Sequence, residues 1–120
     1  MAEQYGILAQ AFPTAATITQ LYGAPSQSQA VISSILINNQ DAAEDQFWLA
    51  FRKGGTASDV PMQYAYGAGP AQTGGGVRAP SGNPVALTLG ITLGPSDQIW
   101  VMSLNGTTSF NVFGDLISIV

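Results

Sequence analysis

The sequence predicts an all-β protein, a single-domain antiparallel β-sandwich of jelly-roll type with about eight or nine short strands. Two observations lead to this fold class. Apolar and polar residues alternate in several segments, which is typical of strands with one buried face. Turn-forming residues interrupt these segments at intervals of about 8 to 12 residues, as in sandwiches and barrels. A chain of 120 residues fits one domain, so residues 1–120 are expected to form a single unit.

The clearest strand pattern lies in the C-terminal third, over residues 83–114. Residues 85–93 alternate strictly between apolar side chains and small or polar ones. Gly94-Pro95-Ser96-Asp97 then supplies turn chemistry, because proline fixes φ and the Asp and Ser side chains bond nearby backbone. A second strand is expected over 98–104. We interpret this region as a three-stranded antiparallel meander on which the rest of the chain folds.

The Asn105-Gly106 pair predicts a tight hairpin between the second strand and a third strand over 107–113. A type I′ turn needs φ > 0 at both central residues, and Asn-Gly satisfies this need best. One face of the hairpin would then belong to the core: Ile99, Val101, Phe110 and Val112. The other face would carry three large apolar side chains where a solvent-facing strand should be polar: Trp100, Met102 and Leu104.

The other strands are expected mostly before residue 83, together with a free N-terminal end and one long loop. Residues 1–4 are expected to form a free N-terminal arm. Residues 67–83 are rich in glycine and proline and are expected to form a loop longer than most ordered connections. Residues 29–38 are rich in β-branched side chains and predict a central strand buried on both faces. The other expected segments are 5–12 (a strand or a short helix), 16–22, 46–53, 60–66 and a final strand or tail over 115–120.

The charge content of the chain is unusually low. Only 8% of the residues are charged, against about 25% in ordinary soluble domains, and the net charge is −4. So few charges favour a chain that lives in a protein assembly. The three basic residues form no cluster, so direct binding to nucleic acid is not expected. No apolar run is long enough to span a membrane, and no signal peptide is evident, so we expect the chain to be made and assembled in the cytoplasm.

The residue types present exclude most catalytic and metal chemistry. The chain has no His and no Cys, so no Ser-His-Asp triad, Cys-His dyad or zinc site can form. A Ser–Lys dyad would depend on Lys53, which follows Arg52 at a strand end. The acidic residues Asp41, Glu44 and Asp45 form either a solvated loop or a weak Ca²⁺ site. We therefore expect no catalytic residue, no cofactor and no metal, and we do not expect an enzyme.

The large side chains with two-faced patterning are the candidate functional residues. Trp48, Trp100 and Met102 are either core residues or part of a contact with another subunit. Our prediction is a protein interface, because the alternation turns them away from the expected core. The predicted interface residues are Trp100, Met102, Leu104 and Trp48.

Five segments, in this order, carry a family resemblance. They are L-Y-G-A-P (21–25), A-V-I-S-S-I-L-I-N-N (30–39), F-W-L-A-F-R-K-G-G (47–55), L-T-L-G-I-T-L-G-P-S-D-Q-I-W-V (87–101) and S-F-N-V-F-G (109–114). Together they resemble a group of small all-β virion structural proteins of tailed bacteriophages, cyanophages among them. The glycine-rich segment 67–83 and the extension after Gly114 depart from the pattern of that group.

The resemblance implies a non-enzymatic capsid decoration (cement) protein on the outer surface of a phage particle. Its expected partners are the major capsid protein and sister copies in a homo-oligomer. A tail, neck or fibre-associated protein of the same fold is an alternative. From a different class, a carbohydrate-binding module would use Trp48 or Trp100 as a platform on which a sugar ring stacks.

Overall fold

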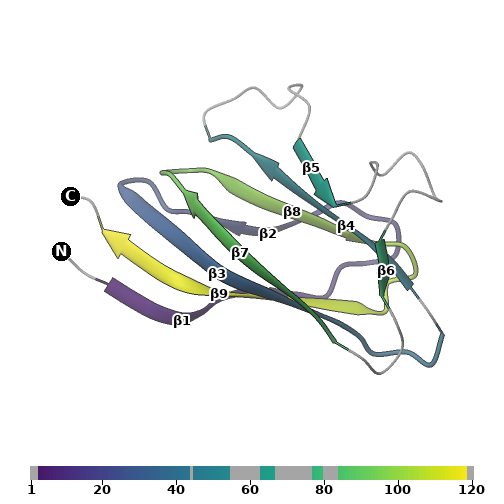
Figure 1. Cartoon of the computed structure of the whole chain (residues 1–120). Coiled ribbons are helices and arrows are strands. Elements are labelled where there is room, and N and C mark those ends of the chain that lie inside the picture. Colours follow the sequence, from purple (N-terminus) through teal and green to yellow (C-terminus); the bar gives the residue numbers. More distant parts are fainter. Residues whose placement is uncertain (1–2, 44, 55–62, 67–76, 80–83, 119–120) are drawn as a thin grey trace.

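The computed structural model describes residues 3–43, 45–54, 63–66, 77–79 and 84–118, and these form two antiparallel sheets (Figure 1). The first sheet has the order β1-β9-β3-β7, made by Glu3–Ala11, Thr108–Ser118, Ser28–Asn39 and Val85–Leu93. The second sheet has the order β2-β8-β4-β5, made by Thr19–Gly23, Gln98–Ser103, Asp45–Arg52 and Gln63–Tyr66. A short strand, β6 (Val77–Ala79), also pairs with β4. No described segment is a helix, and so none is a helix long and apolar enough to cross a membrane.

The connectivity is that of a jelly roll. Strands that follow one another in the sequence mostly lie in opposite sheets: β1 and β2, β2 and β3, β3 and β4, β7 and β8, and β8 and β9. On the edge of β4, β5 lies opposite Leu49–Phe51 and β6 lies opposite Asp45–Phe47, so both occupy one edge position in two pieces. The predicted fold class is therefore confirmed.

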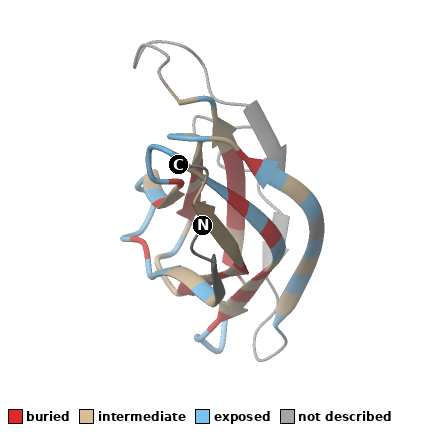
Figure 2. Cartoon of the chain, turned by 90° about the vertical axis from the view of Figure 1, so that its left-hand side faces the viewer, coloured by how far each residue is buried: buried red, intermediate tan, exposed pale blue. Residues whose placement is uncertain are grey.

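The core lies between the two sheets and is built from the inward side chains of both. Buried and exposed bands alternate along the strands, as expected for strands with one covered face (Figure 2). Phe47 and Phe110 meet edge to face across the sandwich, with ring centroids 6.1 Å apart and an interplanar angle of 72°. The other fully buried apolar side chains of the core include Ile32, Ile35, Ile37, Leu49, Ile99, Val101 and Val112.

The predicted three-stranded meander is wrong. β7 pairs with β3, β8 pairs with β2 and β4, and β9 pairs with β1 and β3, so none of the three pairs with another. Gly106 has a positive φ of 72°, whereas Asn105 does not, so no type I′ turn forms. Backbone bonds instead carry this segment from one sheet to the other: Leu104 N donates to Gln46 O (2.9 Å) and Gln40 N donates to Thr107 O (2.8 Å).

The four residues predicted for the core side of that hairpin are nevertheless all buried in the core. They meet from opposite sheets rather than across one ladder, because β8 and β9 face each other through the sandwich. Alternation identifies the buried face of a strand but leaves its hydrogen-bonded partner open. The four residues are Ile99, Val101, Phe110 and Val112.

The turn predicted after residue 93 is present, and it also crosses between sheets. Asp97 N donates to Gly94 O (3.1 Å), and Ser96 takes a positive φ of 68°. The Asp97 carboxylate accepts Gly54 N at 2.8 Å and Gly94 N at 2.9 Å, which ties this turn to the end of β4. Ala24 N donates to Asp97 O (2.9 Å), so the end of β2 is held by the same turn.

Several predicted boundaries differ from the structure. β1 starts at Glu3, paired with Ile117, so only residues 1–2 of the expected arm lie outside the described residues. β9 continues to Ser118, so the expected separate strand over 115–120 is the end of β9. Within the expected loop over 67–83, residues 77–79 form β6 and the other residues before 84 lie outside the described part.

The segment predicted as a strand buried on both faces is central but buried on one face. β3 lies between β9 and β7, and its inward residues Ile35 and Ile37 are buried. On the other face Ser33 is exposed and Val31 is 39% exposed. The β-branched side chains correctly indicate a strand, and Ser33 and Val31 on its outer face are left exposed by the rest of the described chain.

We expect Gly114→Ala to destabilise the protein much more than Gly90→Ala. A Cβ on Gly114 would lie 2.2 Å from Val31 O, whereas a Cβ on Gly90 meets nothing within 4 Å. Overpacking at Gly114 should therefore lower the free energy of unfolding by about 1–3 kcal/mol. Gly90→Ala should be neutral or raise it by about 0.5 kcal/mol through the unfolded chain. Urea unfolding of both variants compares them, and equal stabilities would contradict the close approach of β9 to β3.

Candidate functional site

The predicted interface residues of β4 and β8 lie on the outer face of the second sheet. Trp48 is opposite Met102, and Ala50 is opposite Trp100. Their neighbours along each strand belong to the core, so these side chains point away from it. Leu104 follows the end of β8 and is half-buried.

The structure divides this set of residues into a covered part and a surface part. Trp48 is 1% exposed and Met102 is 3% exposed, so both are already buried within the single chain. Trp100 and Leu104 keep part of their surface accessible. The isolated chain therefore offers Trp100 and Leu104, but hardly Trp48 or Met102, to another molecule. The contact of these residues with another subunit stays a prediction.

The accessible part of this set is a small polar and aromatic cluster around Trp100. The Trp100 Nε1–H donates to Gln98 Oε1 at 2.8 Å, and the Arg52 guanidinium carbon lies 5.5 Å from the ring centroid. This arrangement holds the indole by a hydrogen bond and a cation–π contact. We call Gln98, Trp100 and Arg52 the Trp100 cluster. Arg52 Nε is buried without a hydrogen-bond partner in the described part of the chain, so this atom is not accessible to another molecule.

Asp45 is the most highly connected polar residue of the described part of the chain. It is 1% exposed, at the start of β4. Its Oδ1 accepts the backbone N–H of Gln46 and of Asn105, both at 2.8 Å. Its Oδ2 accepts the Thr108 hydroxyl at 2.6 Å and also the Ser103 hydroxyl. One carboxylate thus fixes the crossover between β8 and β9 to the first residues of β4.

Asn39 and Thr107 extend this network to the end of β3. The Thr107 hydroxyl lies 2.9 Å from Asn39 Oδ1 and 3.3 Å from Asp45 Oδ2. Asn39 is 2% exposed, and its Nδ2 donates to Ala43 O at 2.8 Å. The ends of β3, β4, β8 and β9 therefore meet at one buried polar cluster, which ties the two sheets together.

The acidic loop does not assemble the ligands of a cation site in the described residues. Asp41 is exposed, Asp45 is buried with its oxygens bonded to the chain, and Glu44 lies outside the described part. Across the described ranges there is no group of three acidic, His or Cys side chains close enough to hold a metal. The interpretation of this segment as a solvated loop is wrong for Asp45, because its partners lie about 60 positions away in the sequence.

We expect the stability of the protein to fall in acid partly through Asp45. Burial alone would raise its pKa, but the hydrogen bonds from Ser103, Thr108, Asn105 and Gln46 hold the pKa below the ordinary carboxyl value. The unfolded chain then binds the proton first as pH falls. The stabilisation is complete above the ordinary carboxyl range, about pH 4, and is lost as pH falls through that range toward the folded pKa.

The measurement is the urea midpoint as a function of pH for the wild type and for Asp45→Asn. The wild type should lose stability more steeply than the variant below about pH 5, because the variant has no proton to bind at this position. Parallel curves for the two proteins would contradict the contribution of Asp45.

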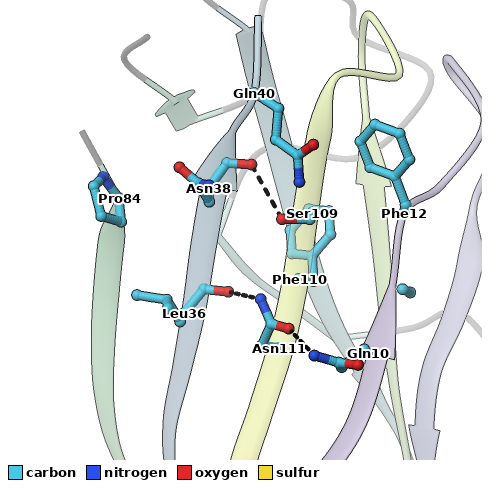
Figure 3. A pocket seen from close by; sticks show the side chains of 10 residues that line it. Gln10, Phe12, Leu36, Asn38, Gln40, Pro84, Ser109, Phe110 and Asn111 are labelled. Carbon is cyan, nitrogen blue, oxygen red and sulfur yellow. Dashed lines mark hydrogen bonds between the residues drawn. The ribbon is translucent and has the colours of Figure 1, made fainter. Parts of the chain in front are cut away.

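The outer face of the first sheet carries an open hollow of about 530 Å³ (Figure 3). Four side-chain amides and one hydroxyl line it, together with Phe12, which is 59% exposed. Gln10 Nε2 donates to Asn111 Oδ1 at 2.8 Å, and Asn111 Nδ2 reaches Leu36 O at 3.5 Å. Sequence analysis missed this site, since its residues come from β1, β3, β9 and the segment before β7. They are Gln10, Ala11, Phe12, Leu36, Asn38, Gln40, Pro84, Ser109, Phe110 and Asn111.

Fold and geometry place the chain in the class of jelly-roll β-sandwich domains. No family model matches the chain, and no curated protein matches it. Among solved structures, it is similar to a chain in the structure of the Gt strain of infectious bursal disease virus, with a TM-score of 0.53 and 12% sequence identity. The match covers 95% of this chain and 31% of that chain. At this identity the likeness shows a shared fold.

Proposed function

We propose that this chain is a structural protein of a virus particle, and more narrowly a decoration protein on the capsid of a tailed phage. The observation that carries the proposal is the likeness, over 95% of the chain, to a domain-sized part of a chain in a virus structure. The phage assignment rests on the sequence resemblance of the segments from 21–25 to 109–114. The low charge content supports a chain that functions inside an assembly.

The mechanism of such a protein is additive burial of surface between neighbouring subunits. Each copy contributes about 25 cal/mol for every Å² of apolar surface removed from water, and the contributions accumulate over many copies. Among the described residues the accessible large apolar side chains include Trp100 and Leu104 near the second sheet and Ile7, Phe12 and Val31 on the first. We assign the contact with the capsid to the Trp100 cluster, since Trp and Arg are the residue types most enriched in interface hot spots.

The free edge of the first sheet supports self-association. β7 forms an edge of this sheet, and none of its nine residues is charged. Natural edge strands usually carry charges or proline that prevent pairing with another chain. An uncharged edge is therefore compatible with sister copies that pair along β7 in the particle.

The decisive experiment is the copy number of the chain in purified particles of the virus that encodes it. Quantitative mass spectrometry against the major capsid protein should find a ratio of the order of one copy, or a simple fraction, per capsid subunit. A few copies per particle would assign the chain to the tail, neck or fibre instead. Absence from purified particles would remove the proposal.

We expect Trp100→Ala to weaken attachment to particles while the folded monomer stays stable. Loss of an interface Trp typically costs about 2 kcal/mol of binding free energy, or about thirtyfold in affinity. Rebinding of purified protein to particles that lack it, measured by co-sedimentation, gives the affinity. Gln29→Ala is the matched control, because Gln29 is an exposed residue of β3, which belongs to the other sheet. An equal loss in both variants, or none in Trp100→Ala, would contradict the assignment of this cluster.

The carbohydrate-binding alternative based on the two Trp residues receives no support from the structure. Trp48 is 1% exposed and presents no ring face to a sugar. The Trp100 ring is in contact with the Arg52 guanidinium. Trp48 is therefore not a stacking platform in the single chain, and Arg52 occupies one face of the Trp100 ring.

A further inference from the structure

We propose that the hollow on the outer face of the first sheet is a binding site for a neutral saccharide. The hollow lies on the opposite side of the sandwich from the Trp100 cluster, since the two occupy the outer faces of different sheets. It is therefore independent of the surface to which we assign contact with the particle. Its chemistry, its preformed polar groups and its exposed aromatic ring all point to this class of ligand.

The lining of the hollow is polar but uncharged. Its amides come from Gln10, Asn38, Gln40 and Asn111, and Ser109 adds a hydroxyl. None of the ten lining residues carries a charge. A carboxamide both donates and accepts hydrogen bonds, as does each hydroxyl of a sugar, so the two match in pairs. A charged ligand would find no counter-charge in this lining.

Part of this polar surface is already fixed in position. Asn111 is held between Gln10 and the Leu36 carbonyl, and the Ser109 hydroxyl donates to Asn38 O at 3.3 Å (Figure 3). The remaining hydrogen and lone pair of the Asn111 amide stay available. Among the described residues no hydrogen bond occupies the side-chain amides of Asn38 and Gln40. The site thus combines a preformed centre with two amides free to meet a ligand.

Phe12 supplies the apolar component that sugar rings require. It follows the last residue of β1, and its side chain is 59% exposed at the rim of the hollow. The next residue, Pro13, is buried, so the backbone on both sides of Phe12 is anchored. A residue before proline also has a restricted backbone. The ring therefore extends from an anchored backbone into an exposed position, where the C–H face of a pyranose could stack on it.

The position of the hollow favours a compact ligand over an extended peptide. The hollow crosses the face of the sheet, from Pro84 before β7 to Phe12 after β1. The lining consists of side chains on the outer face of the sheet, so a ligand there meets side-chain amides rather than the backbone edge of a strand with which an extended peptide would pair. A volume of about 530 Å³ is within the usual range of small-molecule sites.

The test is a titration of the ¹⁵N-labelled chain with named probes, followed by amide chemical shifts. The probes are glucose, galactose, mannose, N-acetylglucosamine, lactose, maltose and chitobiose at millimolar concentration. At least one should shift the signals of residues 10–12, 36–40 and 109–111. The indole N–H signals of Trp48 and Trp100, on the other sheet, should not move. No shift with any of these sugars, or shifts confined to the Trp signals, would overturn the proposal.

Matched variants separate the site from a general surface effect. Ile7 and Phe12 are equally exposed, at 58% and 59%, but only Phe12 lines the hollow. Phe12→Ala should weaken binding about three- to tenfold, and Ile7→Ala should leave it unchanged. Likewise Gln40→Ala should weaken binding, whereas Gln29→Ala, at an exposed position of β3 outside the hollow, should not. Equal effects within either pair would overturn the assignment.

Two further probes define the ligand class. Sialic acid, which carries a carboxylate, should bind more weakly than the best neutral sugar. A capped peptide of Asn, Gln and Ser should not shift the same signals. Stronger binding of the acid or of the peptide would show that the hollow serves another kind of ligand.

Discussion

Asp45→Ala is expected to lower the free energy of unfolding by about 3–5 kcal/mol. The substitution removes the acceptor of four groups that are drawn together from β4, β8 and β9. Because the site is buried, water cannot replace the carboxylate without opening the crossover. A loss of this size is a large part of the stability of a small domain.

The measurement is chemical unfolding of the purified variant at neutral pH. Asp41→Ala is the control, because Asp41 is an exposed acid of the preceding loop that bonds the neighbouring Ala42 N–H. It should change stability by only about 0.5 kcal/mol. If the two variants are equally stable, Asp45 does not hold the crossover as the structure shows it.

Trp48→Ala is expected to lower the free energy of unfolding by about 3–5 kcal/mol, as for other buried aromatic residues truncated to alanine. Trp48 is among the largest fully buried side chains in the described part of the chain. Its Nε1–H is buried without a hydrogen-bond partner, which is an unfavourable feature of the folded state. The stability that Trp48 provides therefore comes from packing of the ring.

Trp48→Phe separates packing from hydrogen bonding. It keeps most of the apolar volume and deletes the unpaired donor, so we expect a loss of only about 1–2 kcal/mol. Thermal unfolding of dilute monomer provides the comparison. A loss in Trp48→Phe as large as in Trp48→Ala would show that the indole N–H is bonded after all. A negligible loss in Trp48→Ala would show that the residue is accessible, as an interface residue would be.

The strands and their buried faces could be predicted from the sequence, because alternation is a local property. The placement of Val101 and Phe110 in the core needed only this pattern. The assignment of β7, β8 and β9 to sheets could not be predicted in this way. Asn105-Gly106 favours a hairpin locally, but bonds from Leu104 to Gln46 and from Gln40 to Thr107 hold the crossover.

The polar features of the structure were harder to foresee than the apolar ones. Asp45 follows two other acidic residues in a polar segment, so nothing nearby in the sequence distinguishes it from a solvated carboxylate. Apart from the neighbouring Gln46 N–H, its hydrogen-bond donors lie at 103, 105 and 108, far along the chain. The hollow near Phe12 was hard to predict for the same reason, because its amides come from segments that become neighbours only after folding.

Two separate strands, β5 and β6, fill the edge position beside β4. The segment that joins them can therefore change in length without disturbing the sheet. β5 ends at Tyr66, opposite Leu49, and β6 begins at Val77, opposite Phe47, so the chain leaves and rejoins the same edge two residues nearer the start of β4. The two ends of the intervening segment are thereby fixed close together. Closing a longer segment between such ends costs only about 0.6 kcal/mol for each doubling of its length. Inserts of very different lengths can therefore be placed between β5 and β6 without a change in the register of β4. This connection is a suitable position for displaying foreign peptides.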